Sequence, residues 1–128
     1  MKITYKQLKA AQAALFKVLN ADLELDVSLG MRRLAKRVDP EFQVYEDERK
    51  KLLTKYGQKN EKGDLIEDKD RNIVFETTEH LTQFQTDLKA LEEQPIEVPE
   101  KCIDLKKLKG IKCSTFDLVA LEPFLIED

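Results

Sequence analysis

The chain has few of the residues on which several protein classes depend. Tryptophan is absent, histidine occurs once and cysteine twice among 128 residues. Two cysteines cannot form the disulfide framework of a small secreted protein, and Cys102 and Cys113 lack the C-x-x-C spacing of a zinc site. No apolar run approaches the roughly 20 residues of a membrane-spanning helix, and the first residues have no signal-peptide core. We expect a reducing cytosol, no membrane contact, and two buried structural thiols.

Catalytic and cofactor patterns are also missing. The four glycines are isolated, so the chain has no glycine-rich phosphate loop. His80 has no second histidine with which to share a metal ion, and we expect it to face solvent in the first turn of a helix. No serine or cysteine stands in a pattern that suggests a base beside it. We therefore expect no enzyme and no cofactor.

Charge is abundant but unevenly distributed. Charged residues make up 37% of the chain, with a formal net charge of −3. Residues 27–59 carry nine Lys and Arg against five Asp and Glu, whereas residues 60–100 carry four against twelve. This separation favours oriented contact with a partner or with another copy of the chain. The length indicates a single domain, 1–128.

A long amphipathic helix is the strongest pattern in the sequence. Apolar or long-stem side chains recur at spacings of three and four, which is one face of a helix from Asp26 to Gly57. Pro40 falls inside this run without shifting its phase, so we expect a kinked but continuous helix. Asp26 or Ser28 is expected to cap its start, and Gly57 to end it in a left-handed conformation. The face comprises Val27, Met31, Leu34, Val38, Phe42, Tyr45, Arg49, Leu52 and Tyr56.

Shorter elements flank this helix. Thr4 and Gln7 form a capping box for a helix at 5–21, and the short link after it predicts that the two helices fold back as an antiparallel pair. A further helix begins at Thr77 or Thr78, and Ser114 and Asp117 cap a short one near the end. Its neighbour, the apolar tail at 124–126, is expected to dock into the core.

The remaining pattern is a β-hairpin. Residues 64–67 and 72–75 flank the turn at 68–71. We predict a mainly α (α+β) fold, with antiparallel helices around one long kinked helix and a small β-hairpin. The same turn has oxygen-bearing residues at EF-hand spacing, but Ile73 stands where a calcium loop needs glycine, so a polar turn is the favoured interpretation over a calcium site. The calcium set would be Asp68, Asp70, Asn72 and Glu79, with the carbonyl of Val74.

Arg32, Arg33, Lys36 and Arg37 form the candidate binding site. They stand on the long helix with no acidic residue between them, which gives local positive potential. Nucleic-acid phosphates are a weaker expectation than an acidic protein surface, because the sequence pI is about 5.4 and nucleic-acid-binding domains are usually basic. A merely solvated helix face is the alternative.

Several segments resemble a family of small phage and prophage proteins of unknown function, mostly from Gram-positive hosts. The likeness lies in the opening 1–4, the run 45–52, residues 55–57, the hairpin at 63–66 and the closing segments 121–124 and 126–128. Pro40 departs from the uninterrupted helix of that pattern. The resemblance implies a phage-encoded protein in a bacterial host cytoplasm or in a virion. It supplies no site residues.

Together these features predict a non-enzymatic module that occupies a surface of a host or phage protein, as an inhibitor or anti-defence factor. A narrow apolar seam on so long a helix as the one from Asp26 to Gly57 also allows a homo-oligomer. The alternative is a virion structural protein, or an accessory to tail or head assembly.

Overall fold

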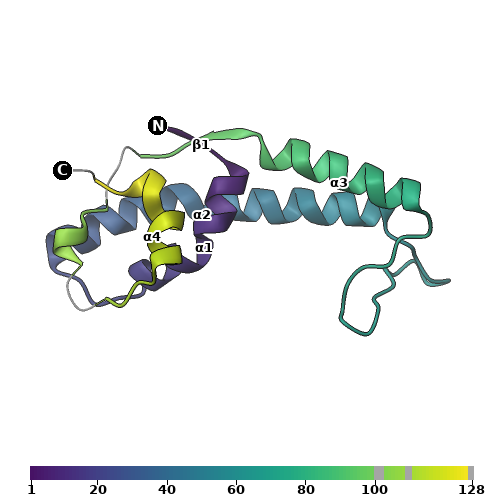
Figure 1. Cartoon of the computed structure of the whole chain (residues 1–128), viewed down its shortest axis with the longest axis horizontal. Coiled ribbons are helices and arrows are strands. Elements are labelled where there is room, and N and C mark those ends of the chain that lie inside the picture. Colours follow the sequence, from purple (N-terminus) through teal and green to yellow (C-terminus); the bar gives the residue numbers. More distant parts are fainter. Residues whose placement is uncertain (100–102, 109–110, 127–128) are drawn as a thin grey trace. The chain divides into compact units, whose positions relative to one another are not determined.

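The structure is a computed structural model that describes residues 1–99, 103–108 and 111–126. Its fold is mainly α with a small β-element, as predicted (Figure 1). The chain forms two compact units, one made of residues 1–42 and 94–128 and the other of residues 43–93. The elements in chain order are β1 (Lys2–Thr4), α1 (Tyr5–Leu19), α2 (Leu25–Tyr56), α3 (Thr78–Glu92), β2 (Pro95–Glu97), the 3₁₀ helix η1 (Leu105–Lys107), α4 (Thr115–Leu121) and the 3₁₀ helix η2 (Glu122–Phe124).

Helix α2 runs without interruption through Pro40, which confirms the prediction from periodicity. Its predicted face turns inward, since the five side chains from Met31 to Tyr45 on that face are buried. The expected cap is wrong: the Ser28 N–H donates to the Glu24 carbonyl (2.8 Å), so Asp26 and Ser28 lie inside the helix.

The first unit contains the main core. The capping box of Thr4 and Gln7 starts α1, as predicted. β1 pairs antiparallel with β2, with Ile3 opposite Ile96, and both isoleucines are buried. The other core side chains come from the inner faces of α1 and α2 and from the C-terminal segment: Leu8, Leu15, Val18, Leu34, Val38, Ile103, Leu121 and Phe124 are examples.

Helix α1 crosses α2 and does not follow it. The Tyr5 hydroxyl donates to Glu41 (2.6 Å), and the Phe16 ring lies 5.8 Å from the Phe42 ring. Residues near both ends of α1 therefore reach the same turn of α2, which differs from the antiparallel pair predicted for these helices. The connector at 20–24 leads the chain away from this crossing point to the start of α2.

Residues 43–93 form the second unit, from the second half of α2, a loop and α3. α3 begins at Thr78, one of the two predicted starts, and Thr77 caps it by accepting from the His80 N–H. The Tyr45 hydroxyl donates to Glu92 (3.4 Å) and the Tyr56 hydroxyl to Asp87 (2.6 Å), so α3 runs antiparallel to this half of α2. Every residue of this unit is described, and only Tyr45 is buried.

The predicted hairpin is less regular than expected. Isolated antiparallel bridges, Lys59 with Leu65 and Glu67 with Ile73, replace its strands, and the regular two-stranded sheet is formed by β1 and β2. Gly57 ends α2, but among the described glycines only Gly63 has a positive φ, so the expected left-handed stop is wrong. Close packing explains why glycine occupies position 57, since a Cβ at Gly57 would lie 2.7 Å from the Leu65 side chain.

Candidate protein-binding surface

A basic face lies on the solvent side of the first half of α2. Arg32, Arg33 and Lys36 are exposed, and none has a hydrogen-bond or ion-pair partner within the described part of the chain. Successive residues of a helix are turned by about 100°, so these three side chains share one side while Met31 and Leu34 point into the core. Unpaired cations on a rigid helix produce a local field that attracts acidic groups.

The fourth predicted residue, Arg37, has a different environment. Its guanidinium donates to Glu41 (3.2 Å), and the same carboxylate accepts from the Tyr5 hydroxyl. Arg37 is therefore part of the contact that joins α1 to α2. The candidate surface is narrowed to Arg32, Arg33 and Lys36, which we call the basic face.

Two exposed leucines extend the basic face toward the start of α2. Leu25 is 76% exposed and Leu29 is 46% exposed. With Arg32 and Lys36 they follow spacings of four, three and four, so all four side chains lie on one side of the helix. Apolar contacts and cations thus stand next to each other, which is the composition of a surface for an acidic partner that also has apolar side chains.

The other sequence-predicted residues do not converge on a site. The Asp68 carboxylate accepts from the backbone N–H groups of Asp70 (2.9 Å) and Asn72 (3.0 Å), so it stabilises a polar turn. Glu79 lies in the first turn of α3. Across residues 1–99, 103–108 and 111–126, no three His, Cys, Asp or Glu side chains gather as metal ligands would.

His80 is exposed in the first turn of α3, as predicted. Cys113 is only half-buried, because it lies in the loop before α4, so the prediction of a buried thiol is wrong at this position. Cys102 falls outside the described residues. The described helices include none that is long and apolar enough to cross a membrane.

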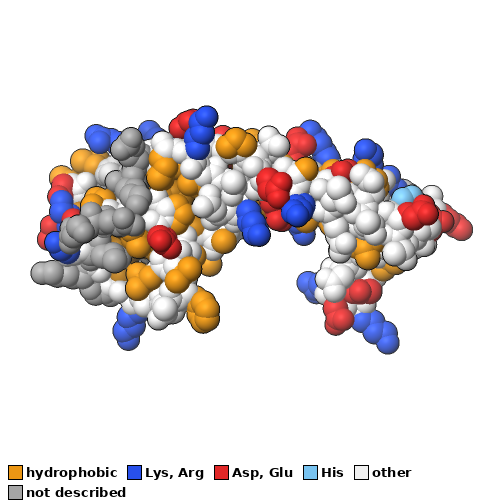
Figure 2. All heavy atoms as spheres, turned by 45° about the horizontal axis from the view of Figure 1, so that its top comes forward, with side chains coloured by type: hydrophobic (Ala, Val, Ile, Leu, Met, Phe, Trp, Pro, Cys, Tyr) orange, Lys and Arg blue, Asp and Glu red, His pale blue; other side chains and the backbone are white. Residues whose placement is uncertain are grey.

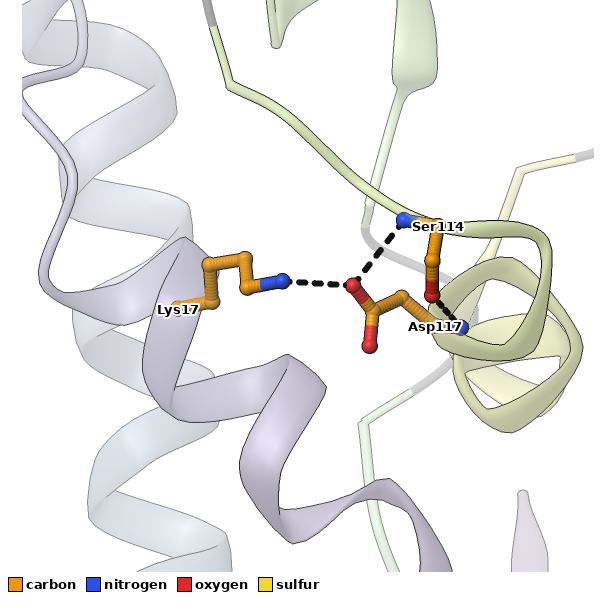
Figure 3. Close-up of polar contacts among 3 residues, drawn as sticks. All are labelled: Lys17, Ser114 and Asp117. Atoms are coloured by element: carbon orange, nitrogen blue, oxygen red, sulfur yellow. Dashed lines mark hydrogen bonds and ion pairs between the residues drawn. The ribbon is translucent and has the colours of Figure 1, made fainter.

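An ion pair fixes α4 on α1 in the first unit (Figure 3). The Lys17 ammonium lies 2.6 Å from the Asp117 carboxylate, which also accepts from the Ser114 N–H (3.0 Å) and so completes a capping box. The hydrogen bond from Lys17 holds the pKa of Asp117 below its ordinary value, and the bond from Ser114 acts in the same direction. The same contact raises the pKa of Lys17.

This pair predicts a measurable acid response. The folded-state pKa of Asp117 lies below its unfolded value, so the pair stabilises the fold above about pH 4 and loses this contribution as the pH falls through the folded-state pKa. In Lys17→Met the pKa of Asp117 should rise, yet stay below the ordinary value because the Ser114 bond remains. Carboxyl-carbon NMR titration measures this. Lys6→Met is the control on the same helix, and equal Asp117 values in both variants would refute the assignment.

No protein-family model, curated protein or solved structure matches this chain. The interpretation of its surfaces therefore depends on their own chemistry. Sequence reasoning found the basic face but missed a second feature: Phe116, on α4, is 87% exposed. The only signal for it was the brevity of the helix, which cannot bury apolar residues on all sides.

Proposed function

We propose that the protein is a phage-encoded, non-enzymatic module that binds an acidic surface on a host or phage protein through the basic face of α2. The observation that carries this proposal is the exposure of Arg32, Arg33 and Lys36, which have no partner among the described residues although the chain is rich in acids. An arginine without an internal partner breaks no ion pair of its own chain when it binds an external carboxylate.

The surroundings of the basic face support the same function. The burial of Met31, Leu34 and Val38 on the opposite side holds the helix rigidly against the core, so little ordering is required when a partner docks. The two exposed leucines supply apolar contact beside the charges. Long-range attraction then accelerates encounter and should weaken as salt screens it, with a Debye length of about 8 Å at physiological ionic strength.

Charge reversal at the basic face tests the proposal. We expect the double variant Arg32→Glu and Arg33→Glu to lose the partner that the unaltered chain retains in affinity capture from phage-infected cells, at least tenfold by quantitative mass spectrometry. Lys50→Glu with Lys51→Glu is the control, because it makes the same charge change on an exposed part of the same helix. It also removes the exposed ion pair of Lys51 with Glu48, which contributes little to stability. Circular dichroism should show both variants folded.

Two outcomes would contradict the proposal. Equal recovery of the partner by both double variants would show that the basic face is not the contact. Co-sedimentation of the protein with purified phage particles, in fixed proportion to the capsid, would instead assign it to the virion as a structural or assembly protein.

A further inference from the structure

The first unit contains a groove that shares no residue with the basic face. It has a volume of about 550 Å³ and runs between β1 and α1 on one side and α4 and η2 on the other. Its walls are mainly apolar, with Ile3 and Ala10 facing Val119, Ala120 and Pro123. Figure 2 shows hydrophobic side chains at the surface of this unit. The Lys17–Asp117 pair fixes α4 on α1 and so sets the position of one wall.

The α4 wall presents apolar side chains to solvent. Val119 is 62% exposed and Phe116 is 87% exposed, and a spacing of three residues places them on neighbouring positions of the helix. Isolated apolar residues are common on protein surfaces. A largely exposed phenylalanine one helical turn from a residue that lines an apolar groove is less common, and such combinations mark sites of interaction.

The β1 wall offers an unpaired strand edge. Met1 and Val98 exchange two backbone hydrogen bonds (2.9 and 3.2 Å), and the Tyr5 N–H donates to Gln94 (3.2 Å). In an antiparallel ladder the intervening residues turn their backbone groups the other way, so the N–H and C=O of Lys2 point away from β2. No described residue bonds them. Lys2 also lines the groove.

The charge beside this edge is positive. Residues 1–21 contain four lysines and no acidic residue. Lys17 is paired with Asp117, whereas Lys2 and Lys6 are exposed without a partner among the described residues. Glu122 is the acidic residue of the opposite wall. A ligand lying along β1 would therefore meet lysines on the strand side and apolar side chains in the groove.

We propose that this groove binds an extended peptide segment of another protein, in which apolar side chains alternate with Asp or Glu. The segment adds to the free edge of β1 by hydrogen bonds to Lys2, as in strand addition. Its alternate side chains point to opposite sides, which places apolar ones between α1 and α4 and acidic ones beside Lys2 and Lys6. This site goes beyond the basic face and does not depend on it.

A displayed library of random peptides, panned on the full chain, tests the proposal. The expected enriched sequences alternate apolar residues with Asp or Glu. A synthetic peptide of the enriched sequence should slow hydrogen exchange at the Lys2 amide, because that N–H becomes bonded. Val119→Asp should weaken its binding at least about tenfold, since the new carboxylate repels the ligand at the mouth of the groove. Val44→Asp is the matched control, an exposed valine on α2.

Several outcomes would overturn the proposal. Enrichment of basic or uncharged peptides, unchanged affinity in Val119→Asp, or an unprotected Lys2 amide overturns the proposal. A dimer in sedimentation that Phe116→Ser dissociates would assign the groove to a second copy, which also overturns it. The double variant Arg32→Glu and Arg33→Glu should bind the peptide with unchanged affinity. A failure of the groove proposal is therefore distinguishable from a failure of the proposed function.

Discussion

Replacing Phe124 with alanine is expected to lower the free energy of unfolding by about 3–5 kcal/mol. The Phe124 side chain is fully buried at the end of η2, and its carbonyl accepts from the Ile103 N–H (2.9 Å), so the ring is held where the C-terminal segment closes the core of the first unit. Removal of the Phe124 ring leaves a cavity, and the backbone is held too firmly by its hydrogen bond to move in and fill it. Urea unfolding followed by circular dichroism measures the loss.

Phe116 provides a control of the same residue type. Because its ring is 87% exposed, Phe116→Ala should change the free energy of unfolding by no more than about 0.5 kcal/mol. Equal losses in the two variants would mean that the C-terminal segment is not packed as described, and would remove the structural basis for the groove beside α4.

Two glycines on α2 and at its end should respond to alanine in opposite ways. At Gly57 a Cβ would lie 2.6 Å from the Leu53 carbonyl oxygen and 2.9 Å from an Ile73 methyl carbon, so the loop must shift to make room. We expect Gly57→Ala to destabilise the second unit by about 1–3 kcal/mol, the usual range for overpacking. Native-state hydrogen exchange at α3 amides measures this locally.

Gly30 is the matched position. It lies inside α2, and a Cβ there meets nothing within 4 Å. Alanine removes the backbone entropy that glycine loses in a helix, so Gly30→Ala should stabilise the chain by roughly 0.5–1 kcal/mol. Stabilisation by both substitutions would contradict the packing of the 58–77 loop against the end of α2.

The helices were predictable because their signals are local. The apolar stripe of α2 keeps its phase over the whole helix. Burial of that stripe stabilises the helix by more than the single backbone hydrogen bond that Pro40 removes. The caps at Thr4, Thr77 and Ser114 each depend on a side chain and an amide three residues away, so a short window of sequence contains them.

The tertiary pairings were not predictable in the same way. β1 pairs with β2, which lies more than ninety residues later in the chain. Each strand has only three residues, which is too short to show an alternating pattern. A short link predicts that two helices fold back on each other, but the contacts of Tyr5 and Phe16 with a single turn of α2 depend on the rest of the core. The irregularity of the predicted hairpin has the same cause. Its two segments share few ladder bonds, and Phe75 packs on Phe84 of α3, a contact that the local pattern does not contain.

The basic face followed from the sequence because a helix that buries one side exposes the other. Predicting the distinct environment of Arg37 would have required two contacts to be known. Glu41 is four residues away and is visible in the sequence, whereas the hydroxyl of Tyr5 reaches it only in the folded chain. The groove could not be predicted from the sequence, because one wall comes from the start of the chain and the other from its end.

The central claim is that α2 is one helix through Pro40, with its apolar face in the core and its basic face outward. Backbone NMR across residues 25–56 tests this most directly. We expect helical Cα and carbonyl shifts without a gap, Asp39 included, and slow amide exchange at Val38 and Tyr45, whose side chains are buried. Coil shifts at Asp39 and Pro40, with fast exchange at Tyr45, would contradict the account.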